Sequence, residues 1–379
     1  MVLLGAVVMA AGHFTLGFHD AFFVGLLLII VGNGCFKPNI SVQIGRLYVD
    51  EDPRKTTAFF IFYCGINLGA FFAPLVCGAL RSAVGYAAGF AAAGVGMGVG
   101  LLIYVAGWAL RLLPPDRERE RSKVTGHSLS FFGQVKVHRW EVLCLITVCA
   151  MTVPFWATYE QSGNTIALYS ETMVDRQVGA WEMPTEFVQA INPFFILAMT
   201  PAVNAVWAFE RRKGMEPTPT GKMAIGLVFV ALSYLYMTLI TGEEGGPHHH
   251  TIPIVFLIVQ SALITWGELY LSPVGLTFVS DYSPQSMTSL LMGCWLLSSF
   301  FGNYLAGWIG TFYGRMSHRM FFTMLALVAA TAAAAMFAVG RRVMRRLERS
   351  REAFANAGEV LAEDPAGVIG GETGRQHAA

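Results

Sequence analysis

Charged residues are scarce in this sequence. Asp, Glu, Lys and Arg make up 13% of its 379 residues, whereas an ordinary soluble domain contains about 25%. This composition excludes a disordered chain and a nucleic-acid-binding protein with a basic face, whereas the formal net charge of +1 says nothing about partners. So little charge is also atypical of soluble enzymes, and it points to lipid as the surrounding medium.

Motifs of catalysis and metal binding are absent as well. The six cysteines form no CxxC pair, so neither a zinc site nor a disulfide framework is indicated. The sequence contains no HExxH, GxSxG or Walker motif. Three histidines, His248, His249 and His250, follow Glu243 and Glu244, and a solvated polar loop explains them better than a metal site. We therefore expect no enzyme, no metal and no cofactor.

Apolar residues are abundant instead. Hydrophobic residues make up 54% of the chain and the mean hydropathy is +0.52. A helix that crosses a bilayer needs about 20 apolar residues. Most of the long apolar runs are too long and too continuous for soluble amphipathic helices. Ten such segments occur, at 2–18, 21–45, 57–80, 86–112, 140–168, 186–209, 221–241, 252–279, 287–312 and 319–340.

These segments predict an all-α, polytopic membrane protein with about ten transmembrane helices, arranged as four and six. We expect a partial N-terminal bundle of four spans over 1–112 and a basic linker over 113–139. A six-helix bundle should follow over 140–340, and then a tail over 341–379 that is first basic and then disordered.

The positions of Lys and Arg predict the orientation of the chain. Cytoplasmic connections of membrane proteins are enriched in these residues. Here they gather in alternate connections, at 46–56, 111–139 and 211–222, and in the tail from 341. The other connections carry only Arg81, Arg176, Arg315 and Arg319. We expect a multi-pass protein of the cell (inner or plasma) membrane with both termini in the cytoplasm.

Three ionisable residues interrupt the apolar segments. Lys37 lies in the second, Glu160 in the fifth and Glu268 in the eighth. An ionisable group within a span is costly and indicates function, although a group close to the membrane surface can reach water by extending its side chain. One cation and two carboxylates favour a polar cavity for a zwitterion, with its carboxylate on the lysine and its ammonium on a glutamate.

Several amides and glycines also lie within the spans. Asn67 and Asn303 either line such a cavity or join helices by hydrogen bonds. The glycine-rich run GFAAAGVGMGVG lacks the lysine and the spacing of a nucleotide-binding loop. Its GxxxG pairs, Gly94 with Gly98 and Gly96 with Gly100, predict close packing between helices instead.

Together these residues resemble the proton-dependent oligopeptide transporter family of the major facilitator superfamily. The resemblance lies first in GNGCFKPNIS, followed by DEDPRKTTAFFIFY and INLGAFFAPLVCG. It continues, in the family's order, through FWATYEQSGNT, INPFF, GELYLSPVGLTFV and MGCWLLSSFFGN. The motifs span about residues 1–340.

The resemblance implies two helical bundles around a central cavity, and symport of di- and tripeptides with protons by alternating access. Small peptides, protons and the lipid bilayer are then its partners, nucleic acid is not, and no particular oligomeric state is indicated. By motif position, Lys37 and Glu160 would couple protons to transport. The residues that would bind peptide are Lys37, Asn67, Asn192, Glu268, Trp295 and Ser298.

One motif of the family has no counterpart here. The ExxER motif of its first helix does not occur before Lys37, and VLLGAVVMAAGHF resembles the family's third helix. The resemblance therefore implies a chain without the first two helices. Two alternatives to a peptide symporter stay open. One is a carrier of nitrate or another small solute with the same fold, and the other is a truncated, inactive or regulatory membrane protein.

Overall fold

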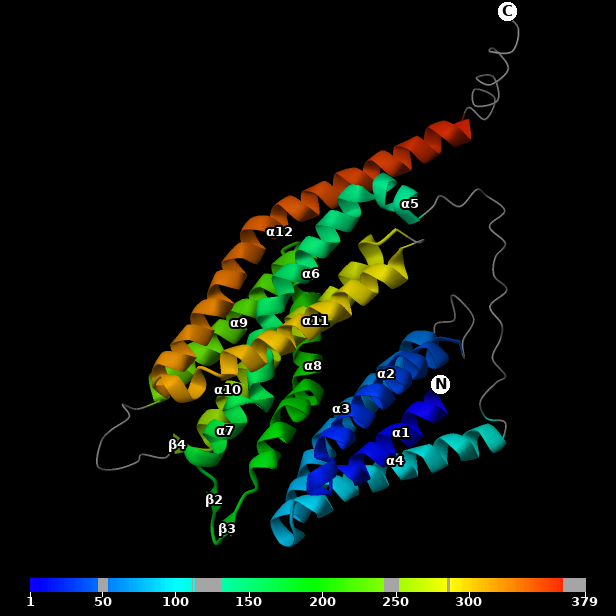
Figure 1. Cartoon of the computed structure of the whole chain (residues 1–379). Coiled ribbons are helices and arrows are strands. Elements are labelled where there is room, and N and C mark those ends of the chain that lie inside the picture. The colour runs from blue at the N-terminus through cyan, green and yellow to red at the C-terminus, as the bar shows by residue number, and fades with distance from the viewer. Residues whose placement is uncertain (47–53, 111, 113–130, 242–251, 285–286, 364–379) are drawn as a thin grey trace, which may run out of the picture. The chain divides into compact units, whose positions relative to one another are not determined.

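The structure is a computed structural model that describes residues 1–46, 54–110, 112, 131–241, 252–284 and 287–363, most of which are helical (Figure 1). The all-α fold expected from the sequence is confirmed. The helices of four turns or more are α1 (Val2–Thr15), α2 (Phe22–Arg46), α3 (Arg54–Val84), α4 (Tyr86–Ala109), α6 (Arg139–Tyr159), α8 (Val188–Arg212), α9 (Pro219–Ile240), α10 (Val255–Tyr282), α11 (Thr288–Gly310) and α12 (His318–Glu363).

Short elements join these helices. The short helices are α5 (Phe131–Val137), α7 (Thr165–Thr172), η1 (His19–Ala21), η2 (Glu160–Gly163), η3 (Thr185–Phe187) and η4 (Tyr313–Arg315). The strands are β1 (Val174–Asp175), β2 (Gln177–Val178), β3 (Trp181–Glu182) and β4 (Ile252–Pro253). Strand β1 pairs in parallel with β4, and β2 pairs with β3 in an antiparallel hairpin. The hairpin turns at Gly179, whose φ of +65° suits glycine.

Nine helical stretches within the described residues are long and apolar enough to cross a membrane. The predicted segment 2–18 differs from the others, because its helix α1 has only 14 residues. At 1.5 Å per residue it is about 21 Å long, which is shorter than a hydrocarbon core of about 30 Å. The predicted ten segments thus appear as nine candidate spans and one shorter apolar helix.

The chain divides into two compact units. Unit 1 comprises the described residues of 1–128, 162–204 and 242–265, and unit 2 those of 129–161, 205–241 and 266–379. Helices α8 and α10 contribute their first parts to unit 1 and their second parts to unit 2. The proposed boundaries at 112 and 140 concern the order of the bundles along the chain and stay a prediction.

In unit 1, glycines bring α1 and α2 into backbone contact. A Cβ atom added to Gly5 would lie 2.7 Å from the carbonyl oxygen of Gly32, and one added to Gly32 would lie 2.8 Å from the backbone nitrogen of Met9. Two turns further along each helix, Gly12 and Gly25 meet in the same way. Apolar surface gains little by leaving lipid, so small residues that permit close van der Waals packing hold such helices together.

The predicted packing role of the GxxxG pairs holds for one of their four glycines. Gly94 of α4 is buried, and a Cβ atom there would lie 3.0 Å from the ring of Phe14 in α1. For Gly96, Gly98 and Gly100, no atom of the described residues lies within 4 Å of an added Cβ.

Unit 2 contains more fully buried side chains than unit 1. Helix α12 packs along α9 and α6, and α11 packs along α6 (Figure 1). At the contact of α9 with α10, Gly226 and Gly267 face each other, and a Cβ on either would lie 2.6 Å from the other's carbonyl oxygen. Fully buried side chains fill the interior of this unit: Leu145, Val148, Phe155, Tyr234, Met237, Phe321, Phe322 and Leu325.

The glycine contact between α1 and α2 predicts how substitutions there affect stability. Gly32→Val would force its side chain into Met9, and overpacking of this kind costs about 1–3 kcal/mol. We expect a lower melting temperature of the purified protein in detergent. Gly34→Val is the matched control on the same helix, because no atom of the described residues lies within 4 Å of a Cβ there. Equal melting temperatures of the two variants would contradict the contact.

Candidate functional site

A hydrogen-bonded carboxylate lies within the apolar helices of unit 2. The hydroxyl of Tyr159, the last residue of α6, donates to Oε2 of Glu268 in α10 over 2.9 Å. The ring of Tyr159 stacks on Phe155 at a centroid distance of 5.6 Å, and Trp156 meets it edge-on at 5.9 Å. These aromatic contacts fix the hydroxyl, and thereby one oxygen of Glu268. The structure adds Tyr159 to the residues selected from the sequence.

Glu160 lies where the α-helix gives way to the 3₁₀ turn η2. Its Oε1 accepts a long hydrogen bond of 3.4 Å from the amide of Asn303, which also donates to the carbonyl of Ser299 over 2.9 Å. The next residue, Gln161, is fully buried and donates to the carbonyl of Ala306 over 3.0 Å. Gln161 thus holds this turn on α11, and with it the backbone of Glu160.

Two further predicted residues, Trp295 and Ser298, are buried on α11. Ser298 donates to the carbonyl of Trp295 over 2.6 Å and accepts a hydrogen bond of 3.2 Å from Thr152. The ring of Trp295 occupies the space beside Gly275, where any side chain would collide with it. Gly275 follows Glu268 by seven residues, which is two helical turns, so the tryptophan packs against the face of α10 that also carries the carboxylate.

The other predicted residues belong to unit 1. Lys37 of α2 has an exposed side chain. Asn67 of α3 is buried, and its amide donates to the carbonyl of Tyr63 over 2.9 Å. Asn192 of α8 donates to the hydroxyl of Thr265 over 2.9 Å, a contact with α10 that the sequence alone did not indicate.

Several predicted residues therefore have defined partners within their own unit. Glu268 contacts Tyr159, Glu160 contacts Asn303, Ser298 contacts Thr152, and Asn192 contacts Thr265. Only weak features of the sequence could have pointed to Tyr159 and the threonines as partners of these residues. Tyr159 directly precedes Glu160 but sits in an aromatic run, and threonines in helices commonly bond only to their own backbone.

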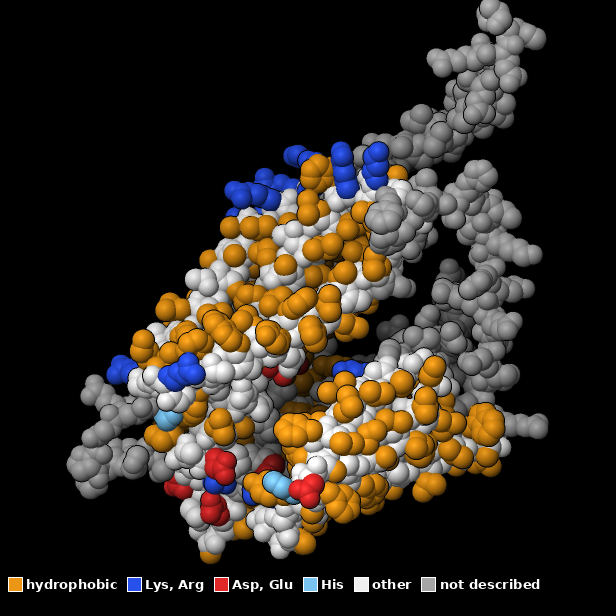
Figure 2. All heavy atoms as spheres, viewed as in Figure 1, with side chains coloured by type: hydrophobic (Ala, Val, Ile, Leu, Met, Phe, Trp, Pro, Cys, Tyr) orange, Lys and Arg blue, Asp and Glu red, His pale blue; other side chains and the backbone are white. Residues whose placement is uncertain are grey.

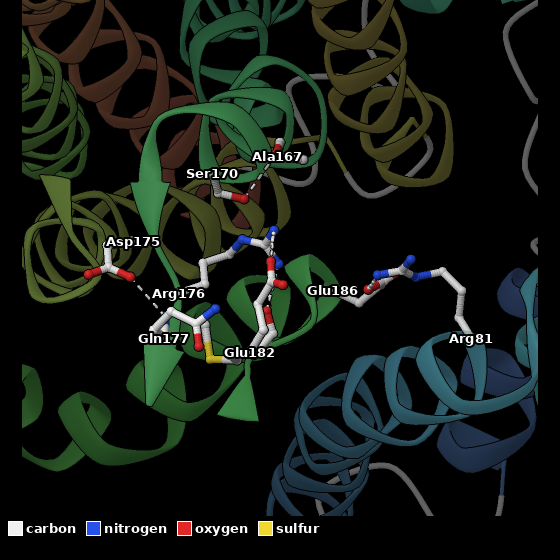
Figure 3. A network of polar contacts seen from close by, with 9 residues as sticks. Arg81, Ala167, Ser170, Asp175, Arg176, Gln177, Glu182 and Glu186 are labelled. Atoms are coloured by element: carbon white, nitrogen blue, oxygen red, sulfur yellow. Dashed lines mark hydrogen bonds and ion pairs between the residues drawn. The ribbon is translucent and has the colours of Figure 1, made fainter. Parts of the chain in front are cut away.

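An ion-pair network lies at the end of α3 in unit 1 (Figure 3). Arg81 of α3 donates to Glu186 of η3 over 2.9 Å and lies over the ring of Tyr86, 5.4 Å from its centroid. A pocket of about 220 Å³ beside this pair is also lined by Glu171 and Gln189. Figure 3 also shows the second pair of this region, Arg176 with Glu182, in the hairpin of β2 and β3.

A second pocket, of about 450 Å³, lies in unit 2 between the end of α8, the start of α9 and the second half of α10. Beside it, Glu216 accepts hydrogen bonds from Lys222 over 2.7 Å and from Arg211 over 3.0 Å. These two cations lower the pKa of Glu216 to about 2. Its carboxylate is therefore ionised above about pH 4, and the pair with Lys222 persists at neutral pH.

Neither pocket is lined by a residue that the sequence analysis selected. The described residues hold no group of three or more His, Cys, Asp or Glu that could bind a metal ion. His248, His249 and His250 lie outside the described residues.

Comparison with known proteins finds one family profile and relatives that are named as peptide transporters. The profile of a family described as "POT family" matches residues 1–139 and 118–324. The "Peptide transporter YePEPT" of Yersinia enterocolitica is 28% identical over 372 residues, which cover 82% of this chain and 72% of that protein. The "Di-/tripeptide transporter" of Lactococcus lactis is 26% identical over 362 residues, covering 78% and 71%.

A solved structure is similar as well. The crystal structure of a peptide transporter POT in complex with sulfate superposes with a TM-score of 0.79 at 26% identity. The match covers 91% of this chain and 80% of that one.

The ion pairs of unit 1 predict unequal effects of two similar substitutions. Glu186→Gln removes the partner of Arg81 from a contact in which both side chains are mostly buried. We expect a loss of about 1–2 kcal/mol, between the values for exposed and for buried pairs. Glu182→Gln, whose side chain is 59% exposed, should cost less than about 1 kcal/mol. Melting temperatures in detergent measure both, and an equal or larger effect of Glu182→Gln would refute this ranking.

Proposed function

Because the chain belongs to the POT family, we propose that it transports di- and tripeptides across the cell membrane by alternating access, in symport with protons. The relatives named as peptide and di-/tripeptide transporters support the substrate class. The observation that carries the proposal in this chain is the carboxylate of Glu268, held by Tyr159 within an apolar helix.

Glu268 binds the peptide's amino group in this proposal. A carboxylate in a low-dielectric cavity attracts an ammonium group strongly, and a hydrogen bond between charged groups contributes about 1.5–3 kcal/mol. The hydroxyl of Tyr159 donates to the ionised form of Glu268 and orients it. Trp295 and Ser298 form part of the cavity wall.

Lys37 binds the peptide's carboxylate, and Asn67 and Asn192 bind its backbone. An Asn side chain has two N–H donors and a carbonyl acceptor. One donor of Asn67 binds the carbonyl of Tyr63, and one donor of Asn192 binds the hydroxyl of Thr265. These bonds orient both amides, and a peptide backbone offers the donors and acceptors that an amide binds. A cation and two carboxylates match a zwitterion better than nitrate or another small anion.

Glu160 and Lys37 couple protons to transport in this proposal. When Glu160 is ionised it attracts Lys37, and this attraction favours one conformation. Protonation of Glu160, or competition by a peptide carboxylate for Lys37, releases it. Proton and peptide then bias the same equilibrium, which is the requirement for coupling.

We also propose that both termini face the cytoplasm. The alternation of basic and nearly uncharged connections along the sequence supports this orientation. The nine candidate spans of the described residues agree with a multi-pass membrane protein.

The substrate is tested by uptake of a radiolabelled dipeptide into proteoliposomes with an inward proton gradient. We expect Glu268→Gln to reduce uptake about tenfold or more, which corresponds to at least about 1.4 kcal/mol. The unchanged protein should take up an N-acetylated dipeptide poorly, since it lacks the ammonium group. Glu182→Gln, in the exposed hairpin, is the control and should transport normally. If the unchanged protein accepts free and acetylated dipeptides equally, Glu268 does not bind the amine.

Coupling is tested by comparing two transport modes. Lys37→Ala should abolish accumulation of dipeptide against its gradient, whereas exchange of dipeptide at equal concentrations should survive, because exchange moves no net protons. Lys136→Ala, in α5, is the control and should retain both modes. Proton-driven accumulation by Lys37→Ala would disprove the coupling role. If the unchanged protein shows neither mode, the inactive membrane protein considered above is the correct alternative.

A further inference from the structure

Helix α12 continues well beyond its apolar stretch. The stretch from His318 to Gly340 contains 23 residues, with one charged residue, Arg319, next to its start. At 1.5 Å per residue it measures about 35 Å, enough to cross a hydrocarbon core of about 30 Å. The helix then continues without a break to Glu363. The residues directly after Gly340 therefore lie at the depth of the lipid headgroups.

On this continuation of α12, most arginines lie on one side of the helix and the apolar residues lie on the other. At 100° per residue, the five arginines between 341 and 349 fall within an arc of about 140°, and the apolar residues of the same stretch fall on the opposite side. Their burial follows the same division. Val343, Met344 and Leu347 are at most 6% exposed. The side chains on the other side are all exposed: Arg341, Arg342, Arg345, Arg346 and Arg349.

Contacts with α6 fix the direction in which the arginines point. The hydroxyl of Ser350 donates to Oε1 of Glu141 over 2.5 Å, and Glu141 is itself buried. The guanidinium of Arg346 lies over the ring of Trp140, 4.2 Å from its centroid. The continuation is thus attached to the first turn of α6, and it presents its remaining arginines outward (Figure 2).

Four of these arginines form what we call the basic face: Arg341, Arg342, Arg345 and Arg349. Among the residues that the structure describes, none of the four has a carboxylate within ion-pair distance. Two exposed glutamates, Glu348 and Glu352, lie on the same helix and reduce the net charge without forming such a pair. The face therefore remains a cationic surface at headgroup depth, with four arginines beside two glutamates.

We propose that the basic face binds the phosphate groups of anionic phospholipids in the adjacent leaflet. Arginine binds phosphate through two parallel N–H donors, which makes it better suited to this ligand than lysine. Clusters of basic residues directly after a membrane span attract anionic headgroups. The depth of the face, its fixed direction and its lack of internal partners favour a lipid over a soluble acidic protein.

The proposal is tested by lipid binding to the purified full chain in detergent. Native mass spectrometry gives apparent dissociation constants for phosphatidylglycerol and phosphatidylcholine. The ratio of the two constants measures the preference for anionic lipid. In the variant with Arg341, Arg342, Arg345 and Arg349 replaced by Gln, we expect this preference to fall at least about fivefold, the factor expected for a single arginine at the surface. Replacement of the same four residues by Lys should retain part of the preference.

A matched variant removes the same number of positive charges elsewhere. It replaces Arg117, Arg119, Arg121 and Lys123 of the linker by Gln, and it should keep the preference for phosphatidylglycerol. If both Gln variants lose the preference for phosphatidylglycerol equally, the effect is one of charge in general. If neither variant loses it, the arginines serve only to orient the chain in the membrane. Either result overturns the proposal. So does polyglutamate binding to the basic face in the absence of a preference for phosphatidylglycerol, since it would indicate an acidic protein partner.

Discussion

In hydrocarbon, a polar group without a partner costs several kcal/mol, and this requirement determines much of the present structure. Thr158, Thr265 and Ser298 each donate to a carbonyl of their own helix. Others join helices: Tyr234 donates from α9 to the carbonyl of Thr158 in α6, and Gln161 donates to Ala306 in α11. Because few polar groups are present, each bond that joins two helices also fixes the position of one helix relative to its neighbour.

The same requirement distinguishes the two units as settings for a binding site. In the most apolar stretches of the spans containing α10 and α11, 44% and 28% of the residues are buried, compared with 11% for those of α2 and α3. Glu268, Trp295 and Ser298 therefore lie on helices whose neighbours hold them in place. A site on such helices needs little rearrangement to bind its ligand. Lys37 lies on α2, whose residues are mostly exposed, and its own side chain is exposed as well.

The sequence predicted the fold well, because a bilayer imposes a length and an apolar composition on each span. Glu268, Trp295 and Ser298 were also found on the expected helices, and the family was identified from motifs alone. The partners of these residues were not predictable. Tyr159 lies in an aromatic run that is typical of a helix core, and its contact with Glu268 joins positions 109 residues apart. The contacts of Gly5 with Gly32 and of Gly226 with Gly267 depend on how two helices align, whereas GxxxG spacing describes only one helix.

The length of α12 has a practical consequence for imaging. Its 46 residues form a rod of about 69 Å, of which the second half continues past the apolar stretch. Membrane proteins with little mass outside the micelle are difficult to align as single particles in electron cryomicroscopy. A continuous helix attached to α6 through Glu141 provides a rigid mounting point. A small helical fusion partner joined in register to α12 would share its axis and serve as a fiducial marker.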